Sequence, residues 1–130
     1  MSIVRSLVPL SLALLAACAQ QPQRDVELDA GSDCPVRLQV GQTLTLMLPS
    51  NPSTGYRWQP GKLTSGALRS LGPEVYSDPE HVGIVGSAGQ STWRFQAMAV
   101  GEERLLLVYQ QPWAPEVEPV QRFDCHVQVR

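Results

Sequence analysis

Apolar and polar side chains alternate along most of this chain, with a period of two residues. Such alternation is typical of β-strands that bury one face. It is clearest in residues 43–48 and 92–97, where every second side chain is apolar. Residues 103–110 are apolar at nearly every position, which predicts a central strand buried on both faces. Together with the glycine and proline turns between them, these patterns predict strands over residues 36–40, 43–48, 56–58, 67–71, 74–76, 92–97, 103–110 and 123–129.

Short strands at this spacing predict an all-β fold in one domain. The sequence after residue 18 has no sustained helical period and no internal repeat. Six to eight such strands favour a β-sandwich. A partly open barrel is the alternative architecture. Residues 112–119 contain three prolines and are expected to form a loop, because proline cannot take a central place in a sheet.

The first 18 residues are expected to be a signal peptide that is not part of the fold. Arg5 supplies a positive start, and residues 7–17 are an apolar stretch too short to span a bilayer well. The stretch runs into Leu-Ala-Ala-Cys at residues 15–18, which resembles a bacterial lipobox. Cys18 would then be lipidated and become the mature N-terminus. The alternative is a plain secretory signal with an incidental cysteine.

The sequence after Cys18 suggests where the mature protein would reside. Ala19, and not an aspartate, follows the cysteine, which implies an outer-membrane lipoprotein that faces the periplasm or the cell surface, or is released. Residues 19–32 are polar and are expected to be a flexible tether, and residues 33–130 the folded domain. The formal charge of −2 argues against nucleic acid as a partner. Because there is no run of basic residues, membrane contact is expected through the lipid alone.

Cys34 and Cys125 are the two cysteines of the expected domain. In an exported chain, two cysteines predict one disulfide. Each keeps step with the apolar residues of its predicted strand, so both are expected to point to the apolar face. The chain-entropy model gives ~4.6 kcal/mol for closing a loop of roughly 90 residues. Two separate buried thiols are the alternative.

Few groups in the chain could support catalysis. His81 and His126 are the only histidines, and a Cys/His pair would need a free thiol, whereas both domain cysteines are assigned to a bridge. His126 is out of phase with its neighbour Cys125 and is expected to face solvent. Asp78, Glu80 and His81 could hold a metal, but a solvated turn explains this segment better. We therefore expect no enzyme activity, no cofactor and no metal.

Three segments have instead the composition of loops that contact another molecule. The first loop is Asn-Pro-Ser-Thr-Gly-Tyr at residues 51–56, in which Pro52 restricts the backbone and Gly55 permits a positive φ. The middle loop, residues 83–90, is small and glycine-rich, but lacks the lysine and helix of a phosphate-binding loop. The third loop contains Gln111, Pro112 and Trp113 just beyond a predicted strand, and an exposed tryptophan is a common interface anchor.

Each loop also has a plainer interpretation. The first could be a tight turn that only connects two strands, and the middle one a hairpin tip without function. Trp113 could fold back over the end of the sandwich. Glu116 and Glu118 make a small acidic stretch that solvation explains.

Taken in order, the NPSTGY segment, the glycine-rich loop and the Pro-Trp pair resemble the chagasin-type inhibitors of papain-like cysteine peptidases. The resemblance runs from about Val36 to Arg130. It implies an immunoglobulin-like β-sandwich with the three loops clustered at one end. The middle loop would enter the peptidase cleft as a wedge, and the other two would clamp its sides. By position, the peptidase-binding residues would be Asn51, Pro52, Ser53, Thr54, Gly55 and Tyr56 in the first clamp, Gly86, Ser87, Ala88 and Gly89 in the wedge, and Pro112 and Trp113 in the second clamp.

Two residues depart from the pattern of that family. Ala88 stands where the family has glycine, and Gln111 where it has arginine. These departures bear on affinity and on the choice of target. The resemblance implies a monomeric, reversible, tight-binding inhibitor whose partner is a papain-like cysteine peptidase. The alternative function is that of a structural or assembly lipoprotein of the cell envelope, which would use the sandwich to bind another protein.

Overall fold

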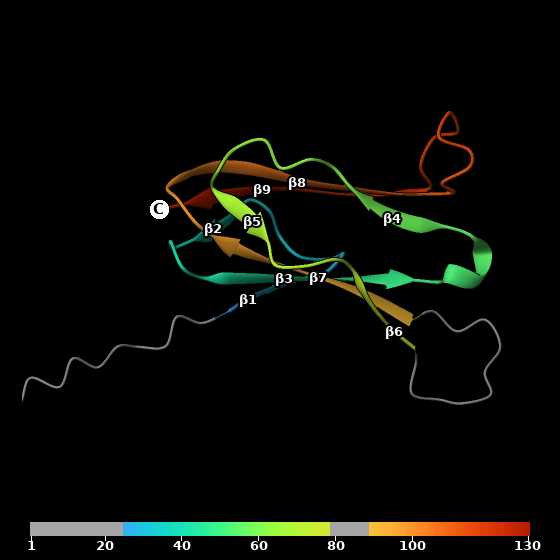
Figure 1. Ribbon diagram of the computed structural model, residues 1–130, viewed down its shortest axis with the longest axis horizontal. Coiled ribbons are helices and arrows are strands. Elements are labelled where there is room, and N and C mark those ends of the chain that lie inside the picture. The colour runs from blue at the N-terminus through green and yellow to red at the C-terminus, as the bar shows by residue number, and fades with distance from the viewer. Residues whose placement is uncertain (1–24, 79–88) are drawn as a thin grey trace, which may run out of the picture.

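The computed structural model describes residues 25–78 and 89–130, and within them it is an all-β protein. Two sheets pack face to face, and one turn of 3₁₀-helix, η1 (Pro52–Thr54), lies at one end (Figure 1). This arrangement confirms the immunoglobulin-like sandwich and excludes the barrel, because the strands form two separate sheets. In these residues the structure has no helix with the length and apolar character needed to cross a membrane.

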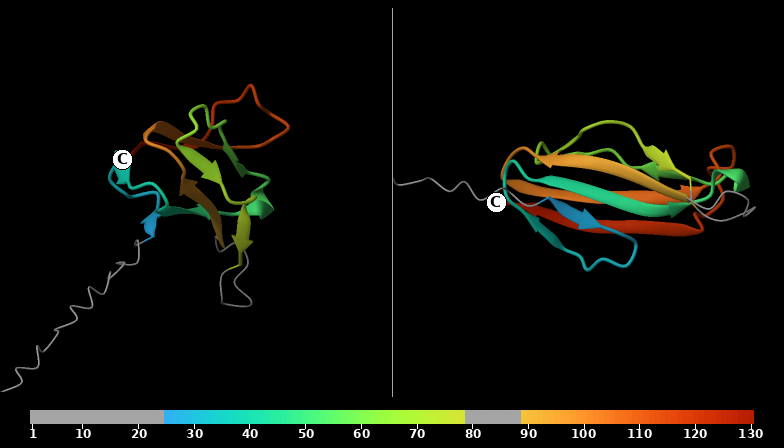
Figure 2. Two further views of the ribbon diagram at one scale, coloured as in Figure 1. Left: turned by 60° about the vertical axis from the view of Figure 1, so that its left-hand side comes forward. Right: turned by 90° about the horizontal axis from the view of Figure 1, so that it is seen from below.

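The strands of both sheets run lengthwise through the molecule (Figure 2). In the first sheet the order is β1-β3-β7-β5, and β6 pairs with the same edge of β7 as β5. In the second sheet the order is β2-β9-β8-β4. The pairs β1–β3 and β2–β9 are parallel, and the others are antiparallel. The strands are β1 (Val26–Leu28), β2 (Val36–Leu38), β3 (Thr43–Ser50), β4 (Arg57–Pro60), β5 (Leu68–Ser70), β6 (Val75–Ser77), β7 (Gly89–Ala97), β8 (Gly101–Gln110) and β9 (Gln121–Val129).

The core lies between the sheets and is built from the alternating residues. Leu44 pairs with Phe95 and Leu46 with Trp93, so the apolar faces of β3 and β7 are in register. Leu107 and similar residues of β8 and β9 face them from the second sheet. The period-two pattern therefore predicted the central strands correctly, since a strand with one buried face must alternate in this way.

The outer face of β8 differs from the prediction. Leu106 and Val108 are only half-buried, whereas Leu105 and Leu107 on the inner face are buried. The expectation of a strand buried on both faces is therefore wrong. Antiparallel sheets commonly leave one face open to solvent, and an apolar residue on that face is no sign of burial.

The expected tether over residues 19–32 is wrong for residues 26–28, which form β1. Val26 pairs with Leu44, and Leu28, which is buried, pairs with Leu46. A turn follows, in which the Asp29 carboxylate accepts from the Gly31 N–H at 2.8 Å. Residues 26–28 contain only two apolar side chains within a polar stretch, so the sequence pattern missed this strand. The folded domain thus extends N-terminally to β1, while Cys18 lies outside the described residues.

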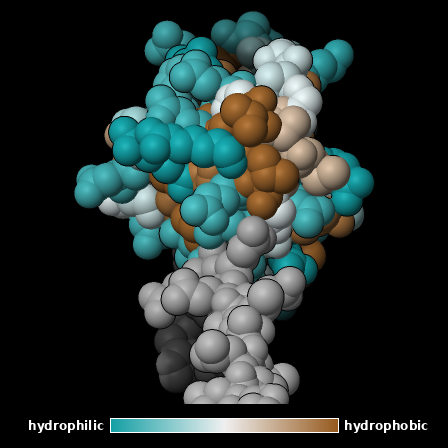
Figure 3. Space-filling view, turned by 90° about the vertical axis from the view of Figure 1, so that its left-hand side faces the viewer, coloured by the Kyte–Doolittle hydropathy of each residue, from teal (hydrophilic) through white to brown (hydrophobic). Residues whose placement is uncertain are grey.

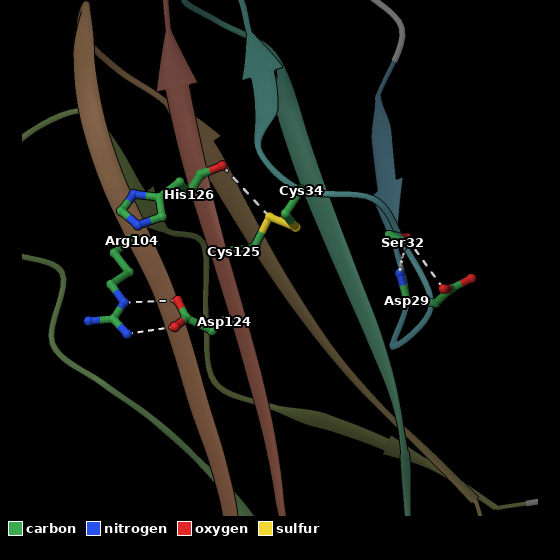
Figure 4. Close-up of a disulfide and its surroundings, with 7 residues drawn as sticks. All are labelled: Asp29, Ser32, Cys34, Arg104, Asp124, Cys125 and His126. Carbon is green, nitrogen blue, oxygen red and sulfur yellow. Dashed lines mark hydrogen bonds and ion pairs between the residues drawn. A yellow bond between two sulfur atoms is a disulfide. The ribbon is translucent and has the colours of Figure 1, made fainter.

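The predicted disulfide between Cys34 and Cys125 is confirmed, with a Cα–Cα distance of 5.4 Å (Figure 4). Cys125 is fully buried, as expected, but Cys34 is exposed and precedes β2. The prediction that Cys34 points to the apolar face is therefore wrong. Of the apolar residues expected to share that face, only Leu38 is buried, and Val40 lies in the following turn. His126 faces solvent, as predicted.

One buried carboxylate, that of Glu103, holds the connection between β4 and β5. It accepts hydrogen bonds from the Ser65 N–H and hydroxyl, both at 2.9 Å, and from the Thr64 N–H at 3.2 Å. Burial alone would raise the pKa of Glu103, but the hydrogen bonds from Ser65 and Thr64 outweigh it and lower this pKa below its ordinary value. The carboxylate is therefore the charged acceptor that closes this loop onto β8.

Candidate functional site

The first and third loops lie at one end of the sandwich because their flanking strands pair there. Arg57, which follows the first loop, pairs with Gln110, which precedes the third loop (residues 111–120). Ser50, which precedes the first loop, pairs with Gly89 at the start of β7. The two strands that flank residues 79–88, β6 and β7, also pair at this end (Figure 1, right-hand side). This register brings the first and third loops to the same end as the strands that flank residues 79–88.

The first loop is held by its own polar side chains. The Asn51 side-chain oxygen accepts from the Ser53 N–H at 3.3 Å and from the Ser53 hydroxyl at 2.5 Å. The Thr54 hydroxyl donates to the Asn51 carbonyl at 2.7 Å. Gly55 has φ +81° and donates its N–H to the Pro52 carbonyl at 3.0 Å, which ends the 3₁₀ turn. The loop is therefore preorganised, and rigid loops lose little entropy on binding.

A buried tyrosine ties this loop to the core. The Tyr109 hydroxyl accepts a hydrogen bond from the Asn51 N–H at 3.1 Å. Its ring packs against Tyr56 and Trp58, with centroid distances of 5.5 and 4.8 Å. Tyr109 is not among the site residues predicted from the sequence. Its position in the sequence nevertheless indicates a role, since Tyr109 is two residues after Leu107 and therefore lies on the same, buried face of the strand. A buried tyrosine normally needs a hydrogen-bond partner for its hydroxyl.

The third loop presents Trp113 to solvent. Its side chain is 68% exposed, so it does not fold back over the core. Instead, the indole ring lies against Gly55 of the first loop. The Gln111 side-chain amide donates to the Thr54 carbonyl at 3.4 Å, a second contact between the third loop and the first. The first and third loops thus form one continuous surface.

This surface is mostly uncharged and contains apolar side chains. Besides Trp113, the third loop exposes Val117 and Val120, each 57% exposed. Its charged residues are Glu116 and Glu118. Among the described residues, no group of three His, Cys, Asp or Glu side chains could hold a metal. The arrangement is suited to binding another protein by shape and apolar contact, not to chemistry.

The middle loop is only partly within the described residues. Gly86, Ser87 and Ala88 lie outside them, as do Glu80 and His81 of the candidate metal set. Gly89 is described, and it is not a loop residue but the buried first residue of β7. This position has no room for a side chain, because a Cβ atom at residue 89 would stand 2.3 Å from the Tyr76 hydroxyl and 2.5 Å from the Ser77 carbonyl. The pKa of Tyr76 is raised above its ordinary value, chiefly by desolvation of the hydroxyl and next by the negative charge of the nearby Asp78 carboxylate.

Comparison with known proteins agrees with this geometry. The model of the chagasin family peptidase inhibitors, I42, matches residues 37–127. Amoebiasin-1 of Entamoeba histolytica is 31% identical over 80 residues, which cover 62% of this chain and 76% of the relative. Two solved structures support the fold. The cysteine protease inhibitor EhICP2 of Entamoeba histolytica has a TM-score of 0.72, with 22% identity over 81% of this chain and 95% of that one. PbICP-C, solved in complex with falcipain-2, has a TM-score of 0.58, with 17% identity over 81% of this chain and 99% of that one.

The family match spans most of the domain and includes both described loops. It extends from Arg37 in β2 to Val127 in β9, and so contains the first loop, the third loop and the strands that position them. The chain therefore belongs to the chagasin family of peptidase inhibitors and, as its sequence led us to expect, is an inhibitor of papain-like cysteine peptidases and not an enzyme.

Proposed function

We propose that the protein blocks the active-site cleft of a papain-like cysteine peptidase with the end of the sandwich that carries the three loops. The observation that carries this proposal is the contact between Trp113 and Gly55, which joins the first and third loops into one exposed, preorganised surface. A preformed surface excludes substrate without any chemical step, and it binds with a small loss of conformational entropy.

The individual loops would then have separate roles. Residues 51–56 would clamp one side of the cleft, and Pro112 and Trp113 the other. Gly86, Ser87 and Ala88 would enter the cleft between them, above the catalytic cysteine. Support comes from the strand register, which brings the flanking strands of all three segments to one end of the molecule. A standard interface of ~800 Å² per partner is within reach of three loops.

Trp113 is the main apolar anchor in this proposal. It is the largest side chain exposed on the described part of the surface. Tryptophan is enriched among the few residues that carry most of the energy of an interface. PbICP-C, which has a similar fold, is in complex with the peptidase falcipain-2, and this supports a peptidase as the partner here.

We also propose that the protein is a monomeric lipoprotein of the outer membrane, facing the periplasm or the cell surface. The lipobox at residues 15–18, followed by Ala19, supports this location. Mass spectrometry of the mature protein tests it. Lipidation predicts an N-terminal Cys18 that carries acyl chains, and a Cys18→Ser variant would be soluble. An unmodified mature chain would exclude the anchor while leaving the inhibitor function untouched.

The inhibitor proposal is tested by titration of the domain into papain with a fluorogenic substrate, using a chain that lacks residues 1–18. We expect reversible, competitive inhibition without cleavage of the domain. If the folded, disulfide-bonded domain does not inhibit papain or other papain-like peptidases at micromolar concentration, the loop surface serves another partner. The rival function, structural or assembly work in the envelope, would then be examined by cross-linking in membranes.

A further inference from the structure

The end of the sandwich opposite the three loops carries an apolar turn. Residues 98–100, between β7 and β8, are Met-Ala-Val, and all three are exposed. Met98 is 42% and Val100 74% exposed. Turns of this kind normally consist of glycine, proline, asparagine, aspartate or serine, so three apolar residues at an exposed tip call for a reason. Figure 3 shows apolar side chains gathered in the middle of this end, with hydrophilic ones around them.

The N-terminal strand enters the domain at this same end. Because β1 runs parallel to β3, Val26 lies near the start of β3, opposite Leu44. Gln42, just before β3, accepts a hydrogen bond from the Ala97 N–H at 2.9 Å, and Ala97 directly precedes the apolar turn. β1 therefore begins at the same end of the sandwich as the apolar turn, with β3 between it and β7.

The distance from Cys18 to this end is short. Seven residue steps separate Cys18 from Asp25, and a fully extended chain of that length spans at most about 25 Å. A lipid on Cys18 would hold Asp25, and with it the start of β1 at this end of the domain, within about 25 Å of the bilayer surface. At such a high effective concentration, even a weak contact is populated.

We propose that the apolar turn formed by Met98, Ala99 and Val100 docks on the lipid surface in which Cys18 is anchored. This inference rests on the proposed lipidation. A second copy of the chain is a poor occupant, because two large side chains fall well short of the ~800 Å² per partner that a stable protein interface buries. A bilayer needs no such area, since each apolar group that enters it contributes separately.

The charges near the turn are mixed. Arg69 on β5 and Arg130 at the C-terminus are exposed there, and so is Glu102 at the start of β8. Mixed charges provide little attraction to anionic lipid, which requires clusters of Lys and Arg. Contact with the bilayer is therefore apolar and insensitive to salt.

Docking at this end would fix the direction of the loops. The ten residues of β8 run from the apolar turn to the third loop and span roughly 33 Å at about 3.3 Å per residue. The inhibitory surface would stand at about this height above the lipid headgroups. A soluble peptidase could then reach it without approaching the membrane.

The test uses the full-length protein, purified with its native lipid and reconstituted into vesicles of phosphatidylethanolamine and phosphatidylglycerol. An environment-sensitive fluorophore is attached to Ala99→Cys, and in a matched protein to Val117→Cys in the third loop. We expect a blue shift at position 99, quenching there by a quencher carried on the lipid, and no effect of 0.5 M salt, which screens surface charges to roughly 4 Å. The fluorophore at position 117 should remain in an aqueous environment. Adding Met98→Ser and Val100→Ser should abolish the shift at position 99.

Each outcome decides between the proposals. If the protein floats with the vesicles but the label at position 99 stays aqueous, membrane docking is wrong and the lipid anchor stands. If the protein does not float and mass spectrometry finds no lipid, both the anchor and the docking are wrong. Papain inhibition by the protein labelled at position 99, whose loops carry no label, reports separately on the inhibitor function.

Discussion

The indole ring of Trp113 lies on the backbone of Gly55 so closely that a Cβ atom at position 55 would stand 2.2 Å from Cη2. Gly55 ends the turn of the first loop, and Trp113 lies near the start of the third. The neighbouring hydrogen bond between Gln111 and Thr54 joins residues that are 57 apart in the sequence. Two distant segments of the chain thereby support each other. Glycine at position 55 serves both the left-handed turn and this contact.

We expect Gly55→Ala to displace Trp113 and to weaken inhibition. Alanine at φ +81° costs about 1–2 kcal/mol in backbone strain, and its Cβ collides with the indole ring. If Trp113 moves out of position, the inhibition constant against papain should rise roughly tenfold, which corresponds to about 1.4 kcal/mol. The control is Gly66→Ala, because a Cβ atom at position 66 meets nothing within 4 Å. Equal inhibition constants for Gly55→Ala and the wild type would show that the contact is unimportant for binding.

Trp113→Ala tests the anchor itself. Loss of a buried interface tryptophan should weaken inhibition by about 1–3 kcal/mol. The midpoint of urea unfolding should change little, because the side chain is mostly exposed in the free protein. Trp113→Phe is the matched variant and should retain part of the affinity. An inhibition constant that does not change on truncation to alanine would remove Trp113 from the interface.

The sequence predicted the alternating strands β3 and β7 and the turn of the first loop well, because both depend on local features. Alternation placed Leu44, Leu46 and Phe95 in the core without reference to the rest of the chain. Pro52 and Gly55 predicted a stiff first loop, and the structure has a 3₁₀ turn there with a left-handed glycine at its end.

The errors have a common origin in tertiary contacts. β1 has three residues and is a strand because β3 offers it an edge, and its two apolar side chains lie within a polar stretch. Gly89 belongs to β7 because Tyr76 and Ser77 cover it, which its local composition does not indicate. The hydrogen bond from Asn51 to Tyr109 joins residues 58 apart, so the sequence could place both residues but not pair them.

Tyr109→Phe should loosen the first loop without altering its sequence. The variant removes the hydrogen bond from the Asn51 N–H to the Tyr109 hydroxyl, which should cost about 0.5–1.5 kcal/mol of folding stability. Inhibition should also weaken, although Tyr109 is 8% exposed and is not expected to touch the peptidase. Tyr56→Phe is the stability control, since in the described structure its hydroxyl makes no hydrogen bond to a neighbouring group. If the two variants unfold at the same urea concentration, the hydrogen bond does not stabilise the loop.

Removal of the disulfide should lower stability more than any of these changes. Cys34 and Cys125 close a loop with a sequence separation of 91 residues. Loss of a native disulfide from a small domain typically costs about 2–5 kcal/mol. A Cys34→Ser/Cys125→Ser variant should therefore show a lower urea midpoint, and reduction of the wild type should give the same midpoint. Identical midpoints for oxidised and reduced protein would mean that the core alone sustains the fold.

Glu103→Gln should produce a loss of stability that depends on pH. The pKa of Glu103 is lowered in the folded state because the hydrogen bonds from Ser65 and Thr64 outweigh burial. A carboxylate with a lowered folded pKa contributes stability that is fully present above its unfolded pKa of about 4.3, and that is lost as the pH falls through the folded value. Glutamine keeps an acceptor but loses the charge, so the variant should be less stable by about 1–3 kcal/mol at pH 7.

The difference in unfolding free energy between Glu103→Gln and the wild type should stay constant from pH 7 to about pH 5. It should shrink below about pH 4.3, because the wild-type carboxylate then takes up a proton. Urea unfolding of both proteins at a series of pH values measures it. The control is Glu102→Gln, because Glu102 is exposed and precedes the buried position. A gap between Glu103→Gln and the wild type that widens as the pH falls would contradict the sign of this linkage. Such a result would mean that burial, and not the hydrogen bonds from residues 64 and 65, governs the carboxylate.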